Sequence, residues 1–269
     1  MGGHSSINRD LARYCGPVAP RSRGIGSAIS AHRIVKCENG DCLHGARSRL
    51  KHVLDDLFRQ PKITRIPKGQ TACMEGQPAE TLFLIQDGLI KLSLFSIDGS
   101  ESVPEILGKG DCFGEECAAE GQPHYAETAT ALTSSAVARV PRPNVLRKLS
   151  DEPDFAKIYI SALVHRVHEY EELFAQHVFE NSEQRLASVL ARVSKFGEWV
   201  DENSVLLPHL THETLSEMVG TTRPRITYFL GKFDRLGILR TGPFLCVNVQ
   251  RLCDVLKLPL IETYQRYEK

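Results

Sequence analysis

The stretch that decides the fold is THETLSEMVGTTRPRITYFLGKFDRLGIL, which runs from Thr211 to Leu239. Apolar residues recur at helical spacing on both sides of Gly220, and glycine tolerates the left-handed backbone conformation that turns a chain. Thr211 is suited to cap the first helix, and Thr221 or Thr222 to cap the second. The pattern therefore predicts a helix-turn-helix, in which the second helix lies in a DNA major groove while the first crosses the backbone.

Two arginines, Arg223 and Arg225, flank Pro224 where the second helix begins. Proline is tolerated there because first-turn amides have no partner inside the helix. Side chains in these first turns reach base edges, and a guanidinium group can bind guanine in a fork. Together with the wing arginine described next, the residues that we predict to contact DNA are Thr211, Thr222, Arg223, Arg225, Thr227, Tyr228 and Arg240.

The segment that follows, LGILRTGPFLCVNVQRLCDVL, reads as a strand, a turn at Thr241-Gly242-Pro243 and a returning strand. This is the wing of a winged helix, where Arg240 is placed to touch the phosphate backbone. Any helical hairpin in a packed domain shows the same period, with its arginines merely solvated. The wing is what favours the DNA-binding interpretation.

Before this module, DEPDFAKIYISALVHRVHEYEELFAQHVF predicts one long helix with Pro153 in its first turn. Its apolar face is too broad for a single covering surface, so we expect a β-roll on one side and a second copy of the helix on the other. The alternative is that the roll alone covers it. Asn181 and Gln184 then form a capping box for a helix that Gly197 closes. One apolar stripe consists of Ile160, Val164, Val167, Phe174 and Val178, and the adjacent stripe consists of Tyr159, Leu163, Tyr170 and Leu173.

Residues 62 to 140 alternate short apolar runs with turn signals, among them Asp87-Gly88 and Asp98-Gly99. In the run Ile90 to Phe95, every second residue is expected to face the interior, as in a half-buried strand. The pattern predicts a small antiparallel barrel or roll. Residues 1 to 45 show no sustained period and read as a tail, and a short amphipathic helix is plausible just after them.

The predicted architecture is therefore α+β, with an N-terminal antiparallel β-roll of jelly-roll type, a long dimerisation helix and a C-terminal winged helix-turn-helix. We divide the chain into a disordered tail (1–45), the roll as sensor domain (46–150), the long helix (151–180) and the DNA-binding domain (181–269).

The composition indicates the cellular compartment in which we expect the protein. The 33 basic and 33 acidic residues cancel, but residues 51 to 179 hold 13 basic against 19 acidic side chains. The 8 cysteines are scattered, and we find neither a secretion signal nor a membrane-spanning run. We expect reduced cysteines, a cytoplasmic protein and no contact with membranes.

The order of roll, long helix and winged helix-turn-helix resembles the CRP/FNR family of bacterial transcription regulators over roughly residues 50 to 260. GKGDCFGEECAAEGQPHYAETATALTSSAVARV is similar to the phosphate-cassette region of that family's sensor roll, and the quoted helices are similar to its DNA-binding helices. The resemblance implies a homodimer on a two-fold symmetric DNA site, with double-stranded DNA, a second copy of the chain and RNA polymerase as partners.

This sequence departs from the family pattern at three places. In cyclic-nucleotide-binding members, a Gly-Glu pair is followed some ten residues later by an arginine and a hydroxyl residue that hold the cyclic phosphate. Here Gly114 and Glu115 match the first pair, but His124 and Tyr125 stand in place of the second. A neutral imidazole is a poor replacement for a guanidinium group, so we do not expect cyclic AMP to bind, although the pocket is open to another small-molecule effector.

The other two departures concern base reading and cysteines. Pro224 stands where the best-known members have a glutamate that accepts a hydrogen bond from cytosine. The DNA half-site of this protein should therefore differ from theirs. The spacing Cys37-x4-Cys42 does not fit the iron–sulfur pattern of oxygen-sensing relatives, and Cys117, expected on a strand, reads as a small buried residue. We expect no cofactor and no metal, while redox sensing through Cys37 or Cys42 stays open.

Two other classes of protein remain as alternatives. A metalloenzyme of the cupin kind needs converging histidines, usually as His-x-His, and no His-x-His occurs. A ligand-binding or redox-sensing interaction module would use the helical hairpin for protein contacts only. A DNA-binding protein loses affinity steeply as salt rises, whereas an apolar protein interface does not.

Overall fold

The computed structural model describes residues 62–256, which fall into two compact units that divide between Val178 and Phe179. The N-terminal tail, the short helix predicted after it, and Cys37 and Cys42 lie outside the described residues. Each unit is described by itself below.

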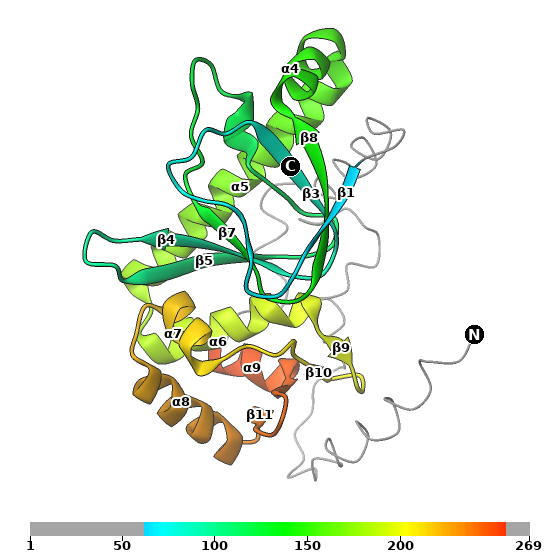
Figure 1. Cartoon of the computed structure of the whole chain (residues 1–269). Helices are drawn as coiled ribbons and strands as arrows, with labels where there is room; N and C mark the ends of the chain where they lie inside the picture. Colours follow the sequence, from blue (N-terminus) through cyan, green and yellow to red (C-terminus); the bar gives the residue numbers. More distant parts are fainter. Residues whose placement is uncertain (1–61, 257–269) are drawn as a thin grey trace, which may run out of the picture. The chain divides into compact units, whose positions relative to one another are not determined.

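The first unit is built on two four-stranded antiparallel sheets (Figure 1), with strand orders β1-β8-β3-β6 and β2-β7-β4-β5. This confirms the predicted antiparallel roll. Gly88 and Gly99 both have positive φ angles, 86° and 82°, as the predicted Asp-Gly turns require. The strands are β1 (Lys62–Ile66), β2 (Thr71–Cys73), β3 (Thr81–Asp87), β4 (Ile90–Phe95), β5 (Glu101–Leu107), β6 (Cys112–Phe113), β7 (Thr128–Ala131) and β8 (Ser135–Pro141).

The predicted alternation along β4 holds only for its first half. Leu92 and Ser93 are both buried, and Leu94 and Phe95 are both exposed. The pairing of β4 with β5 shifts register between Leu92 and Leu94, and such a bulge turns the strand so that the alternation of faces is lost. The expectation that Leu94 faces the interior was therefore wrong.

The core of this unit consists mainly of side chains from both sheets. The rings of Phe83 and Phe113 stack at its centre, with centroids 4.7 Å apart. Helix α4 (Arg142–Asp151) follows β8 and contributes Val145 to the same cluster. The 3-10 helix η1 (Glu115–Ala118) carries Cys117, which is fully buried as predicted but does not lie on a strand.

Helix α5 (Pro153–Phe179) is the predicted long helix, and Pro153 is its first residue. Phe155 and Tyr159 are buried in the core of the roll, so one face of α5 packs on the sheets. Of the two predicted stripes, the one that begins at Ile160 is exposed within the chain: Ile160 is 59%, Val167 55% and Phe174 72% exposed. None of the helices described between residues 62 and 256 has the length and apolarity needed to cross a membrane.

The second unit packs helices on a small antiparallel sheet of order β11-β12-β10-β9. Its first helix begins with the predicted capping box of Asn181 and Gln184, but it ends at Val193, and Gly197 follows in extended conformation after a 3-10 turn. The elements are α6 (Ser182–Val193), η2 (Ser194–Phe196), β9 (Glu198–Trp199), β10 (Ser204–Leu206), α7 (His212–Val219), α8 (Arg223–Arg235), β11 (Leu239–Arg240), β12 (Cys246–Asn248) and α9 (Val249–Leu256).

Candidate nucleic-acid interface and sensor site

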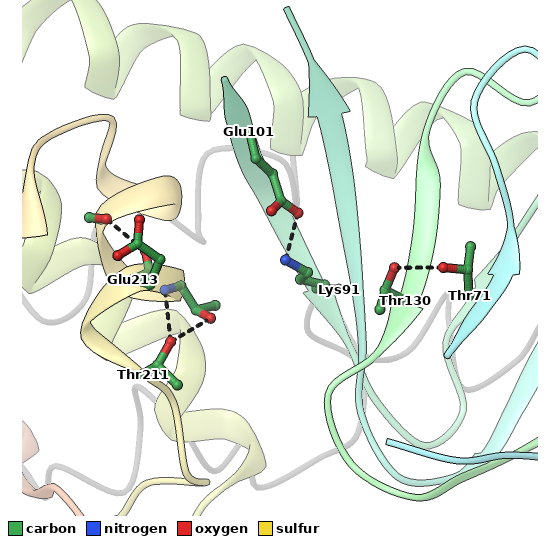
Figure 2. A network of polar contacts seen from close by, with 8 residues as sticks. Thr71, Lys91, Glu101, Thr130, Thr211 and Glu213 are labelled. Carbon is green, nitrogen blue, oxygen red and sulfur yellow. Dashed lines mark hydrogen bonds and ion pairs between the residues drawn. The ribbon is translucent and has the colours of Figure 1, made fainter. Parts of the chain in front are cut away.

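Helix α7 is the first helix of the predicted hairpin. The Thr211 hydroxyl accepts a hydrogen bond from the backbone N–H of Thr214 at 3.0 Å, the capping contact drawn in Figure 2. Gly220 ends the helix in left-handed conformation, with φ 65° and ψ 51°. Both signals that predicted a helix and a turn are confirmed.

Helix α8 begins at Arg223, with Pro224 in its first turn as predicted. Thr222 occupies the N-cap position, but its side chain makes no capping hydrogen bond. The inner face carries Ile226, Leu230 and Phe233, all buried. Because this face is anchored in the core of the unit, the opposite face of α8 is held outward.

That outward face carries the side chains predicted to read DNA. Arg223, Arg225 and Thr227 are exposed, and Tyr228 is 63% exposed. The guanidinium carbon of Arg225 lies 5.7 Å from the centroid of the Phe229 ring, a distance at which a cation stacks on an aromatic face. The helix tip thus presents two cationic groups beside a hydroxyl and an aromatic ring.

A contact between the two helices of the hairpin was not anticipated from the sequence. Nδ1 of His212, in the first turn of α7, lies 2.9 Å from Oγ1 of Thr227 on α8. The Thr227 hydroxyl is also 3.1 Å from the backbone carbonyl oxygen of Arg223. Helical period places Thr227 outward but gives no sign of its partner on the other helix.

The predicted wing is present. β11 and β12 pair antiparallel, with Arg240 opposite Cys246, and the turn between them includes exposed Phe244. The Thr241 hydroxyl donates to Asp234 of α8 at 2.8 Å, which ties the turn to the hairpin. The residues after Asn248, which were read as part of the returning strand, form helix α9 instead.

In the roll, Gly114 and Tyr125 serve the packing of the cassette. Gly114 has φ 81°, and a Cβ atom there would lie 2.7 Å from the carbonyl oxygen of Thr81. The buried Tyr125 hydroxyl donates to that carbonyl at 3.0 Å and accepts from the N–H of Thr81 at 3.1 Å. His124, the neighbour of Tyr125, is exposed. Of the four residues that were predicted to line an effector pocket, Gly114 and Tyr125 thus lie together against Thr81, whereas His124 is exposed.

Glu115 is held by the long helix. Its carboxylate forms an ion pair with Arg166 of α5, whose guanidinium also donates to the Cys112 carbonyl at 2.9 Å. The Tyr159 hydroxyl donates to the backbone carbonyl of Glu115 at 3.0 Å. Burial raises the pKa of Glu115, an effect that the guanidinium group opposes. Its second carboxylate oxygen has no hydrogen-bond partner among the described residues.

Two more acids belong to the same electrostatic environment. Burial raises the pKa of Glu127 to about 7, and this carboxylate accepts a hydrogen bond from the Tyr170 hydroxyl at 3.1 Å. Glu105 and Glu115 raise the pKa of Glu127 further, while Arg166 lowers it. Arg166 thus interacts electrostatically with three carboxyl groups, those of Glu105, Glu115 and Glu127.

Within residues 62 to 256, no group of three His, Cys, Asp or Glu side chains is arranged to hold a metal ion. Burial raises the pKa values of the Cys73 and Cys117 thiols to about 12. A thiol with so high a pKa is a poor nucleophile and metal ligand at neutral pH. These two cysteines act as packing residues.

Comparison with known families matches both units of the chain. Residues 63–152 match the model of the cyclic nucleotide-binding domain, and residues 184–255 match the model of the Crp-like helix-turn-helix domain. The first match covers strands β1 to β8, and the second covers both helices of the hairpin and the wing.

Individual relatives agree with these matches. A CRP-like cAMP-activated global transcriptional regulator of Mycobacterium tuberculosis is 25% identical over 185 residues, which cover 68% of this chain and 82% of that protein. The structure of FixK2 from Bradyrhizobium japonicum superposes with a TM-score of 0.64 at 18% identity, covering 72% of this chain and 96% of that one. A CRP/FNR-family transcriptional regulator of Thermus thermophilus gives a TM-score of 0.61 at 21% identity, covering 73% and 99%.

Proposed function

The chain belongs to the CRP/FNR family of DNA-binding transcription regulators, and from that premise we propose that it is a homodimer that reads a two-fold symmetric DNA site through helix α8. Regulators of this family are not enzymes. We include RNA polymerase among its partners and the cytoplasm as its location, as the family implies.

The observation that carries the proposal is the exposed tip of α8. Arg223 and Arg225 project from the first turns of a helix whose opposite face is buried, so both guanidinium groups are free to meet a groove. Thr211 at the cap of α7, Thr222, Thr227 and Tyr228 extend this surface, and Arg240 adds a phosphate contact from the wing.

Dimerisation is supported by the exposed apolar stripe of α5. Five large side chains, which follow a spacing of four and three residues interrupted only at Glu171, are left uncovered by the roll, and a second copy of the helix is a surface of matching shape and polarity. The stripe consists of Ile160, Val164, Val167, Phe174 and Val178.

For the roll we propose a small-molecule effector other than cyclic AMP. An anionic phosphate needs cationic partners, yet Arg166 is already paired with Glu115 and also interacts electrostatically with Glu105. Tyr125 directs its hydroxyl to Thr81 and not outward. Of the residues predicted to line the pocket, Glu115 and His124 remain the polar groups that an effector would meet.

The test is DNA selection from a random pool with the full chain, followed by affinity measurements on the selected operator. We expect Arg223→Ala and Arg225→Ala each to lose selectivity, by ~1–3 kcal/mol per lost bidentate contact, because the fork to guanine disappears. Arg235→Ala serves as the matched control, since Arg235 is exposed in the last turn of the same helix, and it should leave selectivity unchanged.

Two outcomes would contradict the proposal. If both variants keep the selectivity of the unaltered protein, α8 does not read DNA through its tip. If affinity for DNA does not fall as salt rises, phosphate contacts are absent and the hairpin is an interface for another protein.

A further inference from the structure

The direction of the contact between His212 and Thr227 is inferred from a second hydrogen bond of the Thr227 hydroxyl. Oγ1 of Thr227 lies 2.9 Å from Nδ1 of His212 and 3.1 Å from the carbonyl oxygen of Arg223. A hydroxyl group has one hydrogen, and a carbonyl oxygen only accepts. If the Thr227 hydrogen is donated to the carbonyl, the hydrogen between Thr227 and His212 must come from Nδ1.

This assignment does not depend on the charge of the imidazole ring. The neutral tautomer with hydrogen on Nδ1 and the doubly protonated ring both donate from that nitrogen. In either form the Thr227 oxygen donates once to Arg223 and accepts once from His212. One lone pair is left, and because the Thr227 side chain is exposed, that lone pair is available to a partner outside the protein.

We propose that His212 fixes Thr227 as a hydrogen-bond acceptor on the reading face of α8, so that Thr227 selects a base whose amino group points into the major groove. The inference rests on the proposed function, since it requires α8 to lie in that groove. It makes Thr227 a specificity-determining residue and His212 the residue that positions it.

The chemistry of base edges gives the class of ligand. In the major groove, adenine presents its N6 amino group and cytosine its N4 amino group, whereas guanine O6 and thymine O4 only accept. An acceptor held in place therefore favours adenine or cytosine. The position of Pro224 strengthens this reasoning, because the acidic acceptor that the family resemblance places there is absent from this chain.

His212 also holds the side chain of Thr227 in one orientation. Threonine in a helix divides between two rotamers, which exchange the positions of its hydroxyl and methyl groups. The N–H of His212 stabilises the rotamer that directs the hydroxyl toward α7. Without it, the methyl group competes for the same place, and the preference for an amino group weakens.

The experiment uses the full chain and the operator that it selects. At each position of the half-site, adenine is replaced by purine and cytosine by 2-pyrimidinone, which lack the exocyclic amino group. We expect one position at which this replacement weakens binding of the unaltered protein roughly 3- to 10-fold, the effect of one hydrogen bond. Thr227→Val, which keeps the shape of threonine but has no acceptor, should bind both DNAs equally.

His212 is tested by removal and rescue. His212→Leu should lose most of the discrimination at that same position, while His212→Asn, whose amide N–H can replace the Nδ1 hydrogen, should retain it. A purely structural role would not distinguish one base position from the others, and a misfolded variant would lose all binding.

The possible failures are distinguishable. If the unaltered protein selects no DNA sequence, both the proposed function and this inference are wrong. If it selects an operator through Arg223 and Arg225, but Thr227→Val still discriminates against the base without its amino group, only the role of Thr227 is wrong. If Thr227→Val loses the discrimination but His212→Leu keeps it, His212 does not position Thr227.

Discussion

Glu127 lies half-buried in the roll beside a tyrosine and among other acids. Its carboxylate accepts from the Tyr170 hydroxyl, and Arg166 is the cation whose charge lowers its pKa. Burial outweighs these two favourable contacts and raises the pKa to about 7. The ionised form of Glu127 is therefore disfavoured in the folded chain.

This makes the stability of the roll depend on pH. Below the ordinary pKa of 4.5 both the folded and the unfolded chain hold the proton, and between 4.5 and about 7 only the folded chain does. Stability therefore falls as pH rises through this window. We expect Glu127→Gln, which keeps an acceptor for Tyr170, to be more stable than the unaltered protein above about pH 7, by up to ~3 kcal/mol, and equal to it below about pH 4.

Urea denaturation of the full chain at several pH values measures this difference. Glu120→Gln is a suitable control, because the Glu120 side chain is exposed on the roll, and its curve should follow that of the unaltered protein. A gain in stability that is the same at every pH would show that the charge of Glu127 is not the cause.

The sequence allowed some of these residues to be identified and not others. Arg223 and Arg225 were predictable because a helix tip is a local feature, set by a turn glycine and a few apolar positions. Glu115 and Arg166 are 51 residues apart, so no spacing rule connects them. The contact between His212 and Thr227 depends on how two helices cross, which their periods do not specify.

At the scale of elements, α5 illustrates how an apolar period divides between two surfaces. Phe155 and Tyr159 are buried against the sheets, while Val164 and Val167 are exposed at 49% and 55%. The period of the sequence predicted two stripes, with Tyr159 in one and both valines in the other, but it did not identify Phe155. Only the structure shows that the roll covers one stripe and leaves the other exposed. The alternative that the roll alone covers the whole apolar face is therefore wrong for a single chain.

We expect Val164→Asp and Val167→Asp each to convert the proposed dimer to monomers, because a buried charge between paired helices has no partner. Analytical ultracentrifugation of the full chain measures the change, and affinity for the two-fold operator should fall with it. Ser161→Asp, an equally acidic change at an exposed position off the stripe, is the control. If both valine variants remain dimers, the subunits pair through another surface.

Elements with partners distant in sequence were the hardest to predict. Strand β10 pairs with β12, about forty residues later, and has only three residues, so its own pattern is too short to recognise. Likewise, the bulge in β4 arises from pairing with β5 and reverses the expected facing of Leu94. In contrast, α7 and α8 carry their signals within themselves, and both were predicted.

For the molecule as a whole, the distribution of charge indicates different roles for the two units. The formal net charge is zero, yet residues 51 to 179 hold an excess of acidic groups, and the surface predicted to meet DNA carries arginines. An acidic sensor unit is a poor surface for a polyanion, so DNA contact is expected from the second unit alone.

We expect the same acidity to disfavour anionic effectors in the roll. A cyclic nucleotide brings a phosphate charge to a region where Arg166 is already paired with Glu115 and also interacts with Glu105. We therefore expect calorimetry of the full chain with cyclic AMP to show no binding heat, and operator affinity to be unchanged at about 1 mM nucleotide, the range of weak ligands. The M. tuberculosis relative, described as cAMP-activated, would serve as the positive control. Micromolar binding to this chain would mean that the carboxylates are protonated or displaced when the nucleotide enters, and repeating the titration with Glu127→Gln would then show whether Glu127 is one of them.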